Sequence, residues 1–317
     1  MLVCLLMKRI VGLLFLISLN VNAQVITQNF GTGINAFSID FVQIGNPNNS
    51  ADSSGFPNPV GSVSYIYNIS KYEISRSMIE LANSEGNLGI TLNDLTNFGG
   101  NYPNRPANGI SWYEAARFVN YLNIQSGSSG AYKFDSNGSF QVWNSSDAGF
   151  NSSNPFRNTN ARYWLPSIDE WYKAAYGSPS GQWYSYPNAS DSPPAIVTNG
   201  TTGSVHWLSP SSGPADINDA GALSAWGTMA QGGNIGEWME TAFDGINDSA
   251  NENRANRGGS WYSNSNFQLS TSQLSFDPAT EIDNGTGFRI AGVPEPSALS
   301  LLAVGLGGLA MMRRRRS

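Results

Sequence analysis

Residues 227–261 read GTMAQGGNIGEWMETAFDGINDSANENRANRGGSW, and a second short segment at 287–291 reads GFRIA. Glycine pairs at 232–233 and 258–259 each precede a tryptophan by a few residues. Such pairs mark backbone that bends tightly or passes close to another strand. We therefore expect two tight turns packed against tryptophans, with the fold organised around them.

The carboxylates between these turns allow two interpretations. They surround a hard cation such as Ca²⁺, which prefers oxygen ligands, or they face water, as charges on irregular chain usually do. Spacing alone favours the solvated surface. The residues concerned are Glu237, Glu240, Asp244, Asp248 and Glu252.

The segments GGNIGEW, NRGGSW and GFRIA together resemble the signature of the formylglycine-generating enzyme (sulfatase-modifying factor) family, whose usual form is GGNVWEW, RGGSW and GFR. Three upstream segments match in the expected order, KYEIS at 71–75, NRPANGISWYEAARFVNYL at 104–122 and YWLPSIDEWYKAAY at 163–176. The resemblance implies an α+β fold, the formylglycine-generating-enzyme variant of the C-type-lectin-like fold. In that fold, loops are abundant and two packed helices lie beside small antiparallel sheets.

A capping box marks the start of the clearest helix, because a serine and a glutamate three residues later satisfy the free N–H groups of a first turn. Ser111 and Glu114 form this pattern, and apolar residues then recur with helical spacing, which predicts a helix over 112–123. Ser75 caps a weaker helical segment that runs through Asn83.

A second capping box, Ser167 and Glu170, opens another apolar stripe, which Gly177 ends. We expect this helix to pack side by side with the first one. The tryptophans of the two stripes, Trp112 and Trp171, are expected in the core, where most tryptophans of such stripes lie.

Alternating apolar residues predict strands over 37–42 and 63–70. Asn137-Gly138 predicts a two-residue turn between hairpin strands at 131–134 and 140–143. No internal repeat divides the chain, so a single domain is the simplest expectation.

Regular patterns disappear between 178 and 219, where turn residues alternate with aromatic ones. One interpretation is a sugar-binding surface, because aromatic faces stack on sugar CH groups and acids accept hydroxyl hydrogen bonds. The other is a long loop that covers the sheet with its own aromatics. The ligand-binding candidates are Trp183, Tyr184, Tyr186 and Asp191.

The N-terminal residues predict a signal peptide over 1–23. Lys8 and Arg9 precede an apolar run at 10–19, and Val21-Asn22-Ala23 is a small-residue cleavage site. We expect the mature domain to cover 24–293.

The C-terminal residues 294–317 resemble the PEP-CTERM sorting signal of Gram-negative bacteria. Pro294-Glu295-Pro296 leads into an apolar stretch at 298–312, and a run of arginines at 313–316 follows. The resemblance implies a transient inner-membrane anchor that an exosortase processes, after which the protein reaches the cell surface or extracellular matrix. A permanent single-pass anchor is the alternative.

Cysteine usage and charge limit the chemistry. The only cysteine, Cys4, lies in the predicted signal peptide, so the mature chain has no disulfide and no thiolate. Without both terminal segments the chain keeps 11 basic and 22 acidic residues, a net charge of about −11. Such a surface repels nucleic acid, whose phosphates need clustered Lys and Arg, and leaves cations and neutral polymers as partners.

Catalysis in the resembled family depends on two cysteines shortly after the GGS motif, which bind copper and oxidise a substrate cysteine. Ser263 and Gln268 stand at those places here. Neither a hydroxyl nor an amide replaces a thiolate as a ligand of soft copper(I), so we expect no copper and no formylglycine formation by the family mechanism. A second branch of the family holds iron with several histidines, whereas the mature chain has His206 alone.

The resemblance also implies one structural calcium. Its ligands by position are the main-chain carbonyls of Ala230, Gly233 and Ile235 and the carboxylate of Glu237. Ala230 departs from the usual Asp or Asn, and Gly236 from the usual Trp.

The motifs contain two arginines, Arg257 and Arg289. We expect both to be structural and to pair with buried carboxylates or carbonyls.

The leading hypothesis is an exported, calcium-stabilised and non-catalytic binding module for a polysaccharide or a surface protein. An enzyme of the sulfatase-modifying factor family with another metal-dependent activity is the main alternative. A purely structural matrix protein is the third.

Overall fold

The computed structural model describes residues 25–196, 204–205, 207–208 and 211–294. The predicted signal peptide, nearly all of the predicted sorting tail and His206 lie outside these residues. Within the described part, no helix is long and apolar enough to cross a membrane.

A five-stranded sheet forms one side of the fold, with the strand order β1-β2-β3-β13-β6, and all its neighbours are antiparallel. The strand predicted at 37–42 is confirmed and is longer, whereas the one predicted at 63–70 begins only at Tyr67. The strands are β1 (Val25–Phe30), β2 (Phe37–Ile44), β3 (Tyr67–Ser70), β6 (Tyr163–Trp164) and β13 (Ala291–Gly292).

A four-stranded sheet with the order β11-β10-β9-β12 contains two strands, β9 and β10, from residues 227–261. β12 runs parallel to β9, because it returns to β9 through a long connection instead of a hairpin. The expectation of antiparallel sheets is therefore wrong for this pair and for the small β7–β8 pair. The strands are β7 (Ala195–Ile196), β8 (Ser204–Val205), β9 (Gly236–Ala242), β10 (Asn253–Arg257), β11 (Ser275–Pro278) and β12 (Thr286–Phe288).

The predicted hairpin is present as β4 (Lys133–Phe134) and β5 (Phe140–Gln141). Its strands are shorter than expected, and the predicted two-residue turn is wrong, since residues 135–139 form a five-residue loop. The Asp135 carboxylate accepts the N–H groups of Asn137 and Ser139, which stabilises the wider loop.

Three α-helices are described, and each begins with a capping box. The helix that Ser75 caps extends beyond Asn83 and is a third helix beside the two that the resemblance implied. Short 3-10 turns cover Gly33–Asn35, Thr96–Phe98 and Asn266–Leu269. The helices are α1 (Arg76–Gly86), α2 (Trp112–Gln125) and α3 (Ile168–Tyr176).

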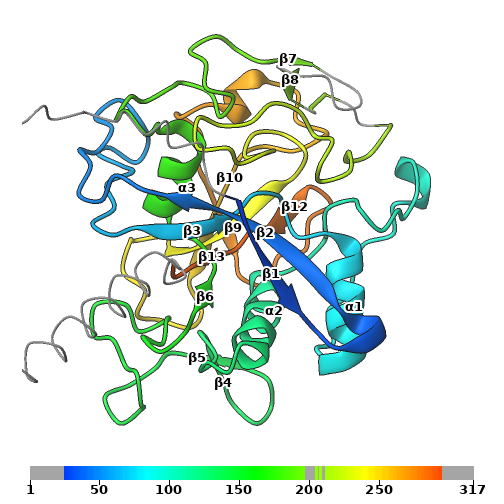
Figure 1. Ribbon diagram of the computed structural model, residues 1–317, viewed down its shortest axis with the longest axis vertical. Helices are drawn as coiled ribbons and strands as arrows, with labels where there is room; N and C mark the ends of the chain where they lie inside the picture. Colours follow the sequence, from blue (N-terminus) through cyan, green and yellow to red (C-terminus); the bar gives the residue numbers. More distant parts are fainter. Residues whose placement is uncertain (1–24, 197–203, 206, 209–210, 295–317) are drawn as a thin grey trace, which may run out of the picture.

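The helices α2 and α3 do not pack side by side as expected. α2 contacts α1 and β6, while α3 contacts β9 (Figure 1). The reason is that their apolar stripes enter different clusters. Trp112 belongs to the large core, and Trp171 belongs to a second cluster beneath the four-stranded sheet. Both tryptophans are fully buried, as predicted.

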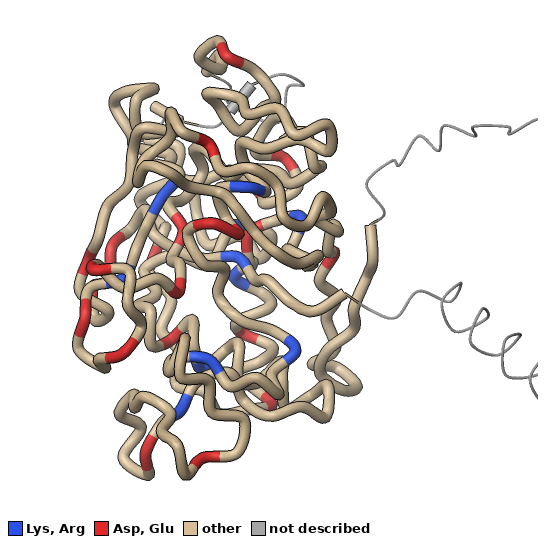
Figure 2. The backbone as a smooth tube through the Cα atoms, turned by 90° about the vertical axis from the view of Figure 1, so that its left-hand side faces the viewer, with Lys and Arg blue, Asp and Glu red and all other residues tan. Residues whose placement is uncertain are grey.

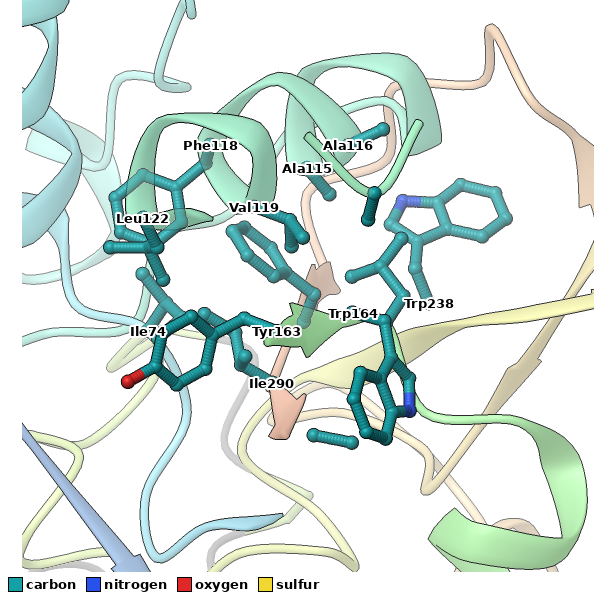
Figure 3. Packing of buried hydrophobic residues seen from close by; sticks show 14 of the residues in the cluster. Ile74, Ala115, Ala116, Phe118, Val119, Leu122, Tyr163, Trp164, Trp238 and Ile290 are labelled. Carbon is teal, nitrogen blue, oxygen red and sulfur yellow. The ribbon is translucent and has the colours of Figure 1, made fainter. Parts of the chain in front are cut away.

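The large core lies between α2 and the strands below it (Figure 3). The α2 stripe, with Val119 and Leu122, points toward Tyr163 of β6 and Ile290 of the GFRIA segment. The GFRIA segment, near the end of the described chain, thus packs in the same core as α1 and α2.

Candidate functional site

The two glycine pairs of residues 227–261 meet in space. The Gly233 N–H donates to the Gly258 carbonyl at 2.8 Å, and the Trp261 N–H donates to the Asn234 carbonyl at 2.7 Å. Gly258 has φ of 108° and its Cβ position lies 3.0 Å from a neighbouring carbonyl, so a side chain is excluded there. The predicted turns therefore form one joined structure beside the four-stranded sheet.

A cavity of about 240 Å³ lies on the face of this sheet, next to the joined turns. Both places at which the resembled family has catalytic cysteines, Ser263 and Gln268, line it. The Ser263 Oγ and the Gln268 Cβ lie 2.9 and 3.1 Å from where a Cβ on Gly259 would stand. The structure thus brings the two sequence-predicted positions together at one cavity.

Both side chains at these positions stabilise their own loop. The Ser263 Oγ accepts the Ser260 N–H at 2.7 Å, and the Gln268 Oε1 accepts the Asn264 N–H at 3.2 Å. A hydroxyl and an amide are hard, neutral donors of electron pairs, which suit copper(I) poorly. The pair therefore holds the cavity wall in shape and lacks the ligands of the family reaction.

Acidic side chains also line the cavity. Asp277, Glu281 and Asp283 line it together with Tyr262, which donates its hydroxyl to Asp283, and the lining includes no Lys or Arg. Burial, with Glu281 and Asp283 nearby, raises the pKa of Asp277. The cavity offers carboxylates, amides and hydroxyls, which is the chemistry that binds hydroxyl groups or cations. The sequence analysis missed this acidic wall, although Gln273, Ser275 and Asp277 alternate as one face of a strand would.

Two of the five carboxylates in residues 227–261 are buried and paired. Glu240 receives two hydrogen bonds of 2.9 Å from Arg157, and Glu237 receives bonds of 2.6 and 2.7 Å from Arg289. Several basic positions accordingly lie in the middle of the molecule beside acidic ones (Figure 2). Asp244 and Asp248 are exposed, so the five residues do not form one site.

The two arginines of the motifs are structural, as predicted. Arg289 also donates to the Met229 carbonyl at 2.7 Å, which ties the loop before β9 to Glu237. Arg257 donates to the carbonyls of Gln273 and, at 3.0 Å, of Thr271.

A second buried carboxylate, Glu73, lies beside the pair of Glu237 and Arg289. It accepts hydrogen bonds from the Asn234 side chain and, at 3.2 Å, from the Ile235 N–H. Burial and the nearby Glu237 raise the pKa of Glu73 well above its ordinary value, and Arg289 offsets only part of this effect. When Glu73 is ionised, the two carboxylates exceed the one guanidinium by one negative charge, and this excess is the reason that burial favours the protonated form of Glu73.

The loop that carries the predicted calcium ligands contains three residues in the left-handed backbone region. Ala230, Gly233 and Asn234 have φ of 61°, 79° and 58°. Outside the sheet ladders, no donor in the described part of the chain bonds the carbonyl of Ala230, Gly233 or Ile235. These carbonyls and the nearby Glu73 carboxylate offer the oxygen ligands that a hard cation prefers. Both oxygens of Glu237 are bonded by Arg289, and one of them also accepts the Trp171 indole N–H. Among the described residues, no cluster of three or more His, Cys, Asp or Glu side chains could hold a metal ion.

The four predicted sugar-binding residues have different contacts. Trp183 lines a separate cavity near α3. The Tyr184 N–H bonds the Tyr176 carbonyl, and Tyr186 packs in a small cluster with a leucine and a tryptophan. Asp191 accepts the Ser185 N–H at 2.9 Å and so closes a turn. Trp183 is thus the member of this group that faces a binding-sized space.

Two family models match this chain. The model of the Sulfatase-modifying factor enzyme 1-like domain matches residues 34–293, and the PEP-CTERM protein-sorting motif matches residues 292–316. No curated protein shows a significant match.

Solved structures share the fold over most of their length. Treponema denticola variable protein 1 aligns with a TM-score of 0.60 and 18% identity, over 85% of this chain and 99% of its own. CarF aligns with a TM-score of 0.57 and 16% identity, over 81% of this chain and 99% of its own. PvdO from Pseudomonas aeruginosa aligns with a TM-score of 0.51 and 12% identity, over 84% of this chain and 98% of its own. Identities this low show a common fold alone.

Proposed function

Because this chain belongs to the Sulfatase-modifying factor enzyme 1-like domain family, we propose that it uses the family fold as a non-catalytic binding module for a polysaccharide or a surface protein. The family and the α+β fold predicted from the motifs are confirmed. The sorting motif implies an exported protein that an exosortase sorts to the cell surface. The finer address that we propose is the surface or extracellular matrix of a Gram-negative bacterium.

One observation carries the proposal. The cavity at the family's catalytic position is present, but Ser263 and Gln268 stand where the family has its copper-binding cysteines. Both side chains form hydrogen bonds that stabilise the cavity wall. The same cavity is lined by carboxylates and hydroxyls, which accept and donate hydrogen bonds. Such a lining holds a polyhydroxylated ligand without supplying a redox centre.

A structural calcium ion is part of the same proposal. Glu237 and the carbonyls of Ala230, Gly233 and Ile235 would hold it, and its charge would favour the ionised form of the nearby Glu73, which burial disfavours. The ion supplies positive charge and order to the loop before β9, and no chemical step is assigned to it.

The first test is mass spectrometry of a peptide with a sulfatase-type cysteine motif, incubated with the purified protein, copper, oxygen and a reductant. We expect the cysteine to remain intact while a cysteine-bearing family member converts it in parallel. Loss of the thiol with formation of an aldehyde would overturn the non-catalytic function and favour the enzyme alternative.

The second test identifies the ligand class. A panel of bacterial surface glycans and surface proteins, titrated with the purified protein, should contain a saturable partner. A purely structural matrix protein would bind none of them saturably.

A further inference from the structure

A second cavity, of about 310 Å³, lies between residues 46–50 and the C-terminal end of α3. It is separate from the cavity at Ser263 and Gln268, since the two share no lining residue. Its lining consists of amides, hydroxyls, glycines, one indole and one ammonium group, without a carboxylate. The volume is in the range of small-ligand sites.

The ammonium group belongs to Lys173 of α3, a residue with only 2% of its surface exposed. Its Nζ donates to the Asn46 carbonyl at 2.9 Å. A lysine has three donors, and among the described residues Lys173 has no second acceptor and no carboxylate partner. Burial lowers its pKa to about 8, so the group is largely charged at neutral pH. The cavity therefore contains a buried positive charge that lacks its counter-ion, an arrangement that costs free energy unless a ligand supplies the anion.

Three amide side chains surround this charge. Asn46, Asn48 and Gln182 are exposed, and in the part of the chain that the structure describes their side-chain amides make no intramolecular hydrogen bond. An amide both donates and accepts. The three groups are therefore free to bond hydroxyls, which also do both.

The indole of Trp183 forms a fixed wall. A Cβ on Gly61 or Gly177 would lie 2.6 or 3.0 Å from its ring carbons, so the two glycines allow the ring to lie against the backbone. The Tyr172 ring packs against it with centroids 5.5 Å apart. A ring held in this way offers an apolar surface at little entropic cost.

We propose that this cavity binds a uronic acid residue of a polysaccharide, with the carboxylate on Lys173, the hydroxyls on the three amides and the sugar ring against Trp183. This uronic acid site rests on the proposed binding function, because that function makes the ligand a saccharide. A neutral sugar would leave the Lys173 charge uncompensated. A phosphate ion would supply the charge but leave the amides and the indole without partners.

The test is calorimetric titration of the full chain with trigalacturonic acid, its methyl ester and inorganic phosphate. The ester keeps the sugar rings and removes the charge. We expect saturable binding of the acid and at least about tenfold weaker binding of the ester, which corresponds to about 1.4 kcal/mol. Phosphate should bind more weakly than the acid. Equal affinities for acid and ester, or no saturable binding of the acid, would overturn the proposal.

Variants assign the binding to this cavity. Lys173→Met should abolish the preference for the acid over the ester, while Lys133→Met, which removes the same charge from a surface pair with Asp147, should leave it intact. Gln182 is exposed and tolerates substitution, so Gln182→Glu should weaken acid binding several-fold and Gln182→Lys should not. Unchanged acid binding in both Lys173→Met and Gln182→Glu would contradict the site. Binding of neutral glycans alone would leave the proposed function standing and remove this inference.

Discussion

Arg289 is the residue on which the interior depends most directly. Its guanidinium bonds both oxygens of Glu237, and neither side chain is exposed. Removing one member of a buried ion pair leaves a charge without compensation, which typically costs about 3–5 kcal/mol. We expect Arg289→Met to lower the free energy of unfolding by about this amount in urea denaturation.

The double variant Arg289→Met/Glu237→Gln is its control. Because it removes both charges, it should recover part of the lost stability. A loss below about 1 kcal/mol in the single variant would show that Arg289 is not essential for balancing the buried carboxylates.

Glu73 gives the protein a pH-dependent stability. Because folding raises its pKa, the folded state binds more protons than the unfolded state above the ordinary value of about 4.3. Stability contributed by this group therefore falls as the pH rises from that value through the folded pKa. In the presence of a chelator, we expect Glu73→Gln to flatten this part of the curve of free energy of unfolding against pH.

Calcium should act on the same curve. A cation beside Glu73 favours the ionised form of this carboxylate, so added calcium should raise the melting temperature of the natural protein at neutral pH and raise that of Glu73→Gln less. If the free energy of unfolding changes with pH by the same slope in the natural protein and in Glu73→Gln, the assigned role of Glu73 is contradicted.

At the scale of elements, α3 depends on its first turn. The Ser167 side chain accepts the Glu170 N–H, and such a cap is worth about 1 kcal/mol. The Glu170 carboxylate does more, since it also accepts the Tyr65 hydroxyl at 2.7 Å and the Trp164 indole N–H at 3.0 Å. We expect Glu170→Ala to cost well over twice as much as Ser167→Ala in urea denaturation. Equal costs would mean that Glu170 serves the cap alone.

The helices could be predicted from the sequence, whereas the short strands could not. Capping boxes placed α2 and α3 correctly because their signals are local to one turn. The strands β6 and β13 have two residues each, which is too short for any alternation, and they exist through partners far away in the chain. Helix packing failed for a similar reason, because a stripe predicts burial without specifying which sheet covers it.

In the candidate site, too, local motifs predicted some residues, whereas the residues that depend on distant partners were not predicted. Motif spacing predicted Ser263 and Gln268, and the structure places both at one cavity. Spacing favoured a solvated surface for Glu237 and Glu240, yet both are buried, because their partners Arg289 and Arg157 come from distant segments. Lys173 was missed, since nothing in its local sequence distinguishes a buried lysine on a helix from a solvated one.

At the scale of the whole molecule, the five-stranded sheet depends on its last strand. β13 lies between β3 and β6 and joins them. We expect a chain that ends at Arg289 to lose the cooperative thermal transition that a chain ending at Val293 retains, because β6 would have no neighbour in the sheet. Differential scanning calorimetry of the two chains measures this, and a cooperative transition in both would show that β13 is dispensable.

The position of β13 sets an order of events during secretion. Translocation threads a chain from its N-terminus, so β1, β2 and β3 emerge long before the strand that links them to β6. The matched sorting motif begins at residue 292, inside β13 itself. The five-stranded sheet can therefore be completed only when the first residue of the sorting motif has emerged, because that residue belongs to β13.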